Sequence, residues 1–192
     1  MRKGFTLIEM MIVVAIIAII AAIAIPSLLA ARRSSLETAG GASMRAYATA
    51  QVNFKKNDWD GDAELEYSPT LPALNNTIDS AGNPITLIDS AFAAAYLGTG
   101  VLAVPNPIGV PPKQGYVFSD LATINLVNID WINDYGLCGA PSVHGRTGYR
   151  SFIIDTEGTV FGRDLGPAAG GGGILVADYP GNPQAAGWIV TE

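Results

Sequence analysis

An uninterrupted apolar stretch near the start of this chain is its strongest hydrophobic pattern. Residues 10–31 carry no charged side chain, and residues 10–25 are all Met, Ile, Val or Ala. At about 1.5 Å of rise per residue, a helix over 10–31 reaches roughly 33 Å, which matches the hydrocarbon thickness of a bilayer. Because the stretch has no polar face, an amphipathic surface helix is excluded and a membrane-spanning helix is predicted.

Helical spacing continues beyond the apolar stretch, to about Lys56. Small and apolar residues at steps of three and four line one face, which is expected to pack on a head domain. They are Leu36, Ala39, Ser43, Ala46 or Tyr47, Ala50 and Phe54. Pro26 removes one backbone donor, and Gly40 and Gly41 each cost on the order of 1 kcal/mol relative to alanine. Local melting or bending of the helix is therefore expected at these points.

After the helix, the pattern changes to loops and then to a period of two. Residues 58–115 are expected to be loops with one short helix at 91–97, capped by Asp89 and Ser90. Alternation then predicts strands at 115–119 and 124–131, a hairpin of 149–154 with 159–163, and terminal strands at 174–177 and 187–190. A long helix followed by antiparallel strands is an α+β arrangement, in which the distal half of the helix covers one face of the sheet.

A carboxylate, Glu9, stands at the beginning of the apolar stretch. Burying it at the membrane edge costs several kcal/mol unless it is paired or neutralised. A secretory signal peptide is the plainest alternative, but its apolar region usually has about 7–15 residues and this one is longer. Some partner must therefore compensate Glu9.

The segment from Lys3-Gly4-Phe5-Thr6-Leu7-Ile8-Glu9 to Pro26 resembles the class III prepilin N-terminus of type IV pilins and type II secretion pseudopilins. The resemblance implies that a prepilin peptidase cleaves after Gly4 and methylates the new amine of Phe5. It implies that Glu9 pairs with the N-terminal amine of a neighbouring subunit, and that the helix around Pro26 is often unwound inside the filament. It also implies a pilin-like fold, in which the hydrophobic half of a long helix protrudes from a small antiparallel head.

The same resemblance implies a division of the chain and a location for it. Residues 1–4 would be a leader peptide, 5–31 the transmembrane or filament-core helix, 32–57 the amphipathic half of that helix, and 58–192 the globular head. The precursor would lie in the inner membrane, with the lipid bilayer as its partner. An inner-membrane assembly platform would then add it to a helical homopolymer, found as a periplasmic or cell-surface filament.

Charge is distributed unevenly along the chain. The net charge is −6, but residues 1–57 hold seven Lys or Arg against two acids, and residues 58–192 hold four against fifteen. A head of net charge −11 is expected to repel nucleic acid and anionic lipid. Neither is therefore an expected partner of the head.

Five acids at alternate positions follow the helix. Asp58, Asp60 and Asp62, with Glu64 and Glu66, resemble the first half of a calcium loop. The segment departs from an EF-hand, because Ala63 replaces the usual glycine and Pro69 replaces the bidentate glutamate. Two interpretations stay open: a looser Ca²⁺ site made by Asp58, Asp60, Asp62 and Glu64, or a solvated acidic turn. No other cofactor is expected.

Few residues are available for catalysis. One histidine, His144, and one cysteine, Cys138, make neither a zinc site nor an internal disulfide. His144 is expected in a surface loop. Cys138 is interpreted as a small apolar residue in a strand, with an intersubunit crosslink as the alternative. The sequence thus predicts a non-enzymatic filament subunit, either a pilin, major or minor, or a pseudopilin. A membrane-anchored extracytoplasmic binding module stays as the other alternative.

Overall fold

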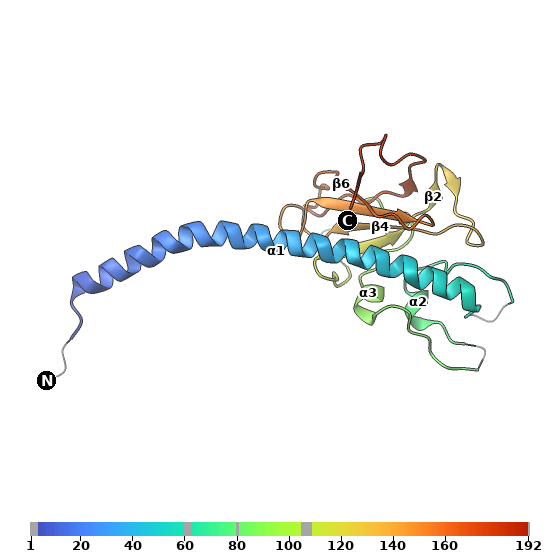
Figure 1. Ribbon diagram of the computed structural model, residues 1–192, viewed down its shortest axis with the longest axis horizontal. Coiled ribbons are helices and arrows are strands. Elements are labelled where there is room, and N and C mark those ends of the chain that lie inside the picture. The colour runs from blue at the N-terminus through green and yellow to red at the C-terminus, as the bar shows by residue number, and fades with distance from the viewer. Residues whose placement is uncertain (1–3, 60–62, 80, 105–108, 192) are drawn as a thin grey trace.

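One long helix and a β-rich head make up this protein, as the α+β prediction requires. The computed structural model describes residues 4–59, 63–79, 81–104 and 109–191. Helix α1 (Leu7–Asn57) packs its C-terminal half against the head, and its N-terminal half projects away as a gently curved rod (Figure 1).

Helix α1 is continuous through Pro26, Gly40 and Gly41, so the local melting expected there is absent. Figure 1 shows a smooth curve instead of a sharp break. At Gly40, an added Cβ would lie 3.2 Å from the rings of Tyr116 and Phe152. The missing side chain therefore allows close contact between α1 and the sheet.

The buried face of α1 agrees in part with the predicted one. Ser43, Ala50 and Phe54 are buried as expected, and Tyr47 is the buried member of the pair Ala46 or Tyr47. Leu36 and Ala39 are only half-buried. Gln51 is the polar member of the buried face. Its amide donates to Tyr47 Oη (2.8 Å) and Ser68 O (2.9 Å), and its Oε1 accepts from Ser68 N (2.8 Å). These hydrogen bonds compensate for the burial of its amide group.

The main sheet is antiparallel, and its strand order is β1-β4-β5-β6-β8. Its strands are β1 (Tyr116–Asp120), β4 (Gly136–Pro141), β5 (Arg150–Asp155), β6 (Phe161–Asp164) and β8 (Ile189–Val190). The predicted strand at 115–119 and the predicted hairpin correspond to β1 and to the β5–β6 pair. Strand β4 was not predicted, because it is buried along its whole length and its sequence therefore shows no alternation.

The single strand predicted at 124–131 is wrong, because this region contributes to two strands of a smaller sheet with the order β3-β2-β7. The chain forms β2 (Thr123–Ile124), turns, and pairs back as β3 (Val127–Asn128). Asn125 and Leu126 make this turn with φ values of 51° and 64°, the left-handed conformation that two-residue hairpin turns require. Strand β7 (Asp178–Tyr179) replaces the strand predicted at 174–177.

Two short helices, α2 (Ala73–Asn76) and α3 (Ser90–Ala94), follow α1 in the chain and precede β1. Asp89 caps α3 as predicted, because its Oδ1 accepts from Phe92 N at 2.9 Å. The helix ends earlier than expected, at Ala94 instead of residue 97.

The two faces of the main sheet carry separate hydrophobic clusters. One cluster joins α1 to the sheet through Met44, Tyr47, Phe118 and Phe152. The other lies on the opposite face and contains Cys138, which confirms its interpretation as a buried strand residue. Burial raises the pKa of the Cys138 thiol to about 12, so the thiol stays protonated near neutral pH.

Candidate functional site

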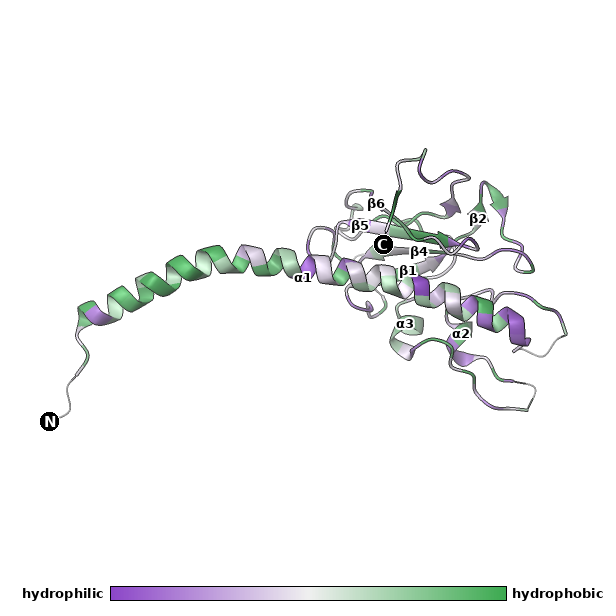
Figure 2. Ribbon diagram, in the orientation of Figure 1, coloured by the Kyte–Doolittle hydropathy of each residue, from purple (hydrophilic) through white to green (hydrophobic). Residues whose placement is uncertain are grey.

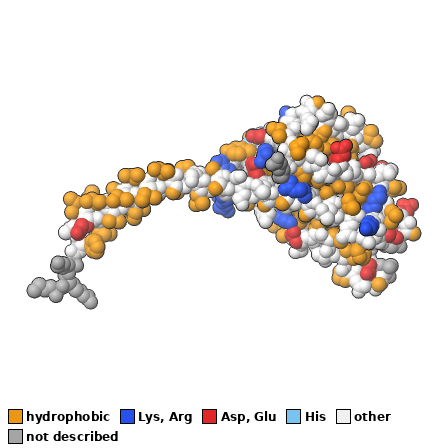
Figure 3. Space-filling view, viewed as in Figure 1, with side chains coloured by type: hydrophobic (Ala, Val, Ile, Leu, Met, Phe, Trp, Pro, Cys, Tyr) orange, Lys and Arg blue, Asp and Glu red, His pale blue; other side chains and the backbone are white. Residues whose placement is uncertain are grey.

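The projecting half of α1 is the largest exposed apolar surface in the described chain. Its large hydrophobic side chains keep about half or more of their area exposed, from 47% at Val13 to 78% at Leu7. Figure 2 shows this rod as almost wholly hydrophobic, and Figure 3 shows apolar side chains along its whole length. By length and composition, α1 is the one helix among the described residues that could cross a membrane. Such a surface requires lipid or other apolar helices around it.

Glu9 closes a capping box at the start of α1. Its Oε2 accepts from Thr6 N (2.8 Å) and Thr6 Oγ1 (2.7 Å), while Thr6 Oγ1 accepts from Glu9 N (3.3 Å). This interaction was not predicted, although Thr-x-x-Glu before an apolar run is the usual sequence signal of a capping box. Within the described chain, Glu9 Oε1 has no hydrogen-bond partner. Thr6 therefore supplies part of the compensation that the sequence analysis assigned to a neighbouring subunit, and one oxygen stays available.

The junction of α1 with the head, here called the neck, is held by two charged residues of the helix. Arg33 Nη1 donates to Gly145 O (2.9 Å) and to Tyr149 Oη (2.6 Å), and the guanidinium lies over the Tyr149 ring. Glu37 accepts from Tyr149 N (2.7 Å) and pairs with Arg150 Nε (3.0 Å). These contacts fix the direction in which the exposed rod leaves the head.

Residues 143–149, here called the neck loop, face α1 across this junction. His144 Nε2 lies 2.8 Å from Asp164 Oδ1, and this hydrogen bond lowers the pKa of the Asp164 carboxyl. His144 lies in a loop as predicted, but its side chain is mostly buried, with 14% of its area exposed. The reason is tertiary, because the partner comes from β6, a strand that sequence reasoning did not connect with this loop.

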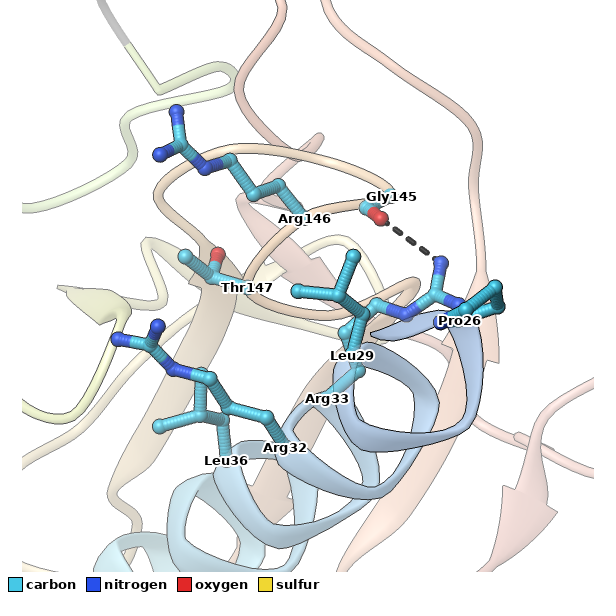
Figure 4. A pocket seen from close by; sticks show the side chains of 8 residues that line it. All are labelled: Pro26, Leu29, Arg32, Arg33, Leu36, Gly145, Arg146 and Thr147. Atoms are coloured by element: carbon cyan, nitrogen blue, oxygen red, sulfur yellow. Dashed lines mark hydrogen bonds between the residues drawn. The ribbon is translucent and has the colours of Figure 1, made fainter. Parts of the chain in front are cut away.

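A cavity of about 410 Å³ separates the neck loop from α1 (Figure 4). Helix α1 forms one wall, with apolar side chains and two arginines, and the neck loop forms the other wall, with a third arginine. The lining residues are Pro26, Leu29, Arg32, Arg33, Leu36, Gly145, Arg146 and Thr147. No local sequence signal could reveal this cavity, because its two walls are more than 100 residues apart in the chain.

The predicted calcium ligands are only partly visible. Asp60 and Asp62 lie outside the described residues, Asp58 follows the last residue of α1, and Glu64 lies beyond the gap. One buried oxygen of Asp58, Oδ1, lacks a hydrogen-bond partner in the described part of the chain. Among residues 4–59, 63–79, 81–104 and 109–191, no group of three or more His, Cys, Asp or Glu is arranged to hold a metal ion.

The calcium site therefore stays a prediction. Addition of Ca²⁺ to the fragment 33–192 should raise its melting temperature if the acidic residues hold the ion, because a ligand that binds only the folded state stabilises it. Mg²⁺ is the control, since it prefers a smaller octahedral site. An unchanged melting temperature at millimolar Ca²⁺ would leave the solvated acidic turn as the interpretation.

The N-terminal segment of this chain is similar to that of known proteins. Residues 1–25 match a family model described as the prokaryotic N-terminal methylation motif. This motif is the part of the chain that resembles the N-terminal segment of type IV pilins. The head gives a different match, because residues 113–181 match a family described as a protein of unknown function, DUF2950.

Two pilins are among the relatives of this chain. The type IV wide pilus major component PilA4 of Thermus thermophilus is 52% identical over 54 residues, which are 28% of this chain and 38% of that protein. The type IV major pilin protein PilA of Myxococcus xanthus is 50% identical over 53 residues, which are 28% of this chain and 24% of that protein. The match thus spans well under half of each pilin. No solved structure matches the chain.

Proposed function

We propose that this chain is the structural subunit of a type IV pilus-like filament. The observation that carries the proposal is an exposed apolar helix, bearing the prepilin motif, that projects from a folded head. In this proposal the precursor sits in the inner membrane, prepilin peptidase removes residues 1–4 after Gly4, and Phe5 is methylated. An inner-membrane assembly platform then moves the subunit into a homopolymer at the cell surface.

In this proposal, Glu9 helps to set the register between neighbouring subunits during assembly. When the rod leaves the bilayer for a bundle of identical helices, lipid contacts are replaced by helix contacts of similar apolarity. The hydrophobic term is therefore nearly neutral, and the register of subunits depends on packing and on polar pairs. The free Oε1 of Glu9 fits the terminal amine of a neighbouring Phe5, and Pro26 supplies a point where the helix can adjust inside the bundle.

Three variants at the start of α1 test the pairing. Glu9→Ala removes the carboxylate and the cap, Glu9→Gln keeps an oxygen for the cap but loses the charge, and Thr6→Ala weakens the cap but keeps the carboxylate. If the pairing drives assembly, both Glu9 variants leave processing intact and reduce filament yield, whereas Thr6→Ala assembles. Sheared filaments and whole-cell subunit levels, compared on immunoblots, give the measurement.

The same three variants can contradict the pairing. Normal filament yield from Glu9→Gln would show that the charge is unnecessary. A yield from Thr6→Ala as low as that from Glu9→Ala would assign the effect to helix capping instead.

Processing has its own test. Gly4→Val should block cleavage, because the peptidase site accepts no branched side chain at that position in this proposal. Mass spectrometry of the intact chain would then find the four N-terminal residues still attached, and no methyl group on Phe5. A cleaved and methylated Gly4→Val chain would contradict the assignment of Gly4 and Phe5.

A pseudopilin of a type II secretion system is the alternative function, because it shares the N-terminal motif. Electron microscopy of cells with and without this chain separates the two. Long surface fibres that depend on the chain support the pilin. Short periplasmic filaments support the pseudopilin, and failure to co-purify with any filament supports a membrane-anchored binding module.

A further inference from the structure

We propose that the neck cavity binds the headgroup of an anionic phospholipid while the subunit is in the membrane. The inference rests on the proposed membrane-inserted precursor, and it assigns a ligand to a cavity that filament assembly leaves unexplained. The ligand class follows from the position of the cavity along α1, from the chemistry of its two walls and from the charges around it.

The cavity lies at the level where α1 would leave the bilayer. Its helical wall runs from Pro26 and Leu29, inside the uncharged stretch 10–31, to Arg32 and Arg33, the first charged residues after it. Arg33 lies seven positions after Pro26, which is roughly 10 Å along the helix axis. A glycerophospholipid has the same two zones, with an apolar region below a phosphate.

Two of the three arginines are available to a ligand. Arg33 already donates hydrogen bonds to Gly145 O and Tyr149 Oη, so its role is to hold the neck loop against α1. Arg32 and Arg146 are exposed, and neither has a hydrogen-bond or ion-pair partner within the described chain. In the view of Figure 4 both side chains extend to the left, Arg146 above Thr147 and Arg32 below it, so they flank this end of the cavity. An arginine guanidinium can form two parallel hydrogen bonds with a phosphate, so this pair suits a phosphodiester.

The nearby acids do not neutralise these arginines. Glu37 is paired with Arg150, and Asp164 is paired with His144. Screening at physiological ionic strength limits interactions between exposed charges to about 8 Å, so the summed charge of the head is a poor guide to the potential at the neck. The repulsion of anionic lipid is predicted from the net charge of residues 58–192, −11, and that sum takes no account of where Arg32 and Arg146 lie.

The test uses the full chain purified in detergent. Native mass spectrometry would compare retention of phosphatidylglycerol with that of zwitterionic phosphatidylcholine. The wild type should retain phosphatidylglycerol preferentially. In the double variant Arg32→Gln/Arg146→Gln, this retention should weaken by about tenfold or more, since one charge-assisted hydrogen bond corresponds to at least that factor.

Arg45→Gln is the matched control. Arg45 is also exposed on α1, but it lies 13 positions beyond Arg32, roughly 20 Å along the helix, and does not line the cavity. It should retain phosphatidylglycerol as the wild type does. Equal loss in Arg45→Gln would show a general charge effect, and unchanged retention in the double variant would show that the arginines are not the site. Either result overturns the proposal.

Inorganic phosphate separates a lipid site from a simple anion site. Phosphate at millimolar concentration should not displace phosphatidylglycerol, because it makes no use of the apolar wall at Pro26 and Leu29. Displacement by phosphate, or equal retention of phosphatidylcholine, would overturn the assignment to an anionic lipid. Since the readout is lipid binding by the isolated chain, this inference can fail while filament assembly stands, and filament assembly can fail while lipid binding stands.

Discussion

Asp120 is a carboxyl group in the interior of the head. It is fully buried at the end of β1, where Tyr47 Oη donates to its Oδ1 (3.3 Å) and Leu71 N donates to its Oδ2 (3.1 Å). Burial penalises the charged form and raises the pKa of Asp120 to about 7, against these hydrogen bonds, which favour the carboxylate. Its protonation is therefore coupled to folding between pH values of about 4 and about 7.

The coupling predicts how stability depends on pH. The folded pKa is raised above the unfolded one, so the folded state binds the proton more tightly and the contribution of Asp120 to stability is lost as pH rises from about 4 to about 7. Urea titrations of fragment 33–192 at pH 5 to 8 would measure its free energy of unfolding. As the pH rises, this free energy should fall relative to that of the Asp120→Asn variant, by up to about 1.4 kcal/mol per pH unit.

An exposed acid provides the control for this prediction. Glu157 lies in the turn between β5 and β6, and its side chain is exposed. Glu157→Gln should keep the pH dependence of the wild type. A slope in Asp120→Asn equal to that of the wild type would assign the effect to other groups.

At the scale of an element, the two adjacent glycines of α1 have different reasons to be glycine. An added Cβ at Gly40 meets the Tyr116 and Phe152 rings at 3.2 Å, whereas one at Gly41 meets no atom within 4 Å. Gly41→Ala should stabilise fragment 33–192 by about 1 kcal/mol through helix propensity. Gly40→Ala should be less stable than Gly41→Ala, because both rings must move.

Thermal unfolding followed by circular dichroism would measure both glycine variants on the same fragment. Each serves as the control of the other, since the two changes add the same methyl group to neighbouring positions of one helix. Equal melting temperatures would show that the contact between α1 and the sheet can relax without cost.

The strand β4 shows why some elements escape sequence analysis. It contains Gly136 and Gly139, at which an added Cβ would lie 2.7 Å from Leu121 and 2.9 Å from Phe118. Glycine is needed at both positions because neighbouring side chains leave no space for a Cβ atom. Glycine is rare in strands on propensity alone, so packing outweighs propensity at β4.

At the scale of the whole molecule, α1 serves two environments in one continuous helix. The apolar stretch of α1 contributes no buried residue to the head, and the buried face begins at Gly40. Fragment 33–192 should therefore fold with the same secondary structure as the head of the full chain. Fragment 46–192 lacks Met44 and the neck contacts of Arg33 and Glu37, and it should lose at least about 4 kcal/mol, or roughly 10 °C in melting temperature.

Circular dichroism and gel filtration of both fragments would check this division. A folded, monomeric 33–192 beside a destabilised 46–192 is the expected result. Equal stability of the two would contradict the part assigned to the region of α1 around Met44. An unfolded 33–192 would show that the head depends on the projecting half of α1.

The sequence by itself determined what depends on neighbours along the chain. Several features are local patterns, because each depends only on residues that are close together in the sequence. They are the long helix, its apolar character, the prepilin motif, the cap at Asp89 and the β5–β6 hairpin. The α+β class followed from their order. The capping box between Thr6 and Glu9 was also local, and it was available to sequence reasoning.

Only the tertiary structure decided what depends on residues far apart in the chain. The neck joins Arg33 and Glu37 to residues 145–150, more than 100 positions away, and the cavity exists only because both sides meet there. The burial of Asp120, the small residues of β4 and the pairing of His144 with Asp164 have the same origin. Which surfaces meet is set by the packing of the whole head, and no window of sequence contains that information.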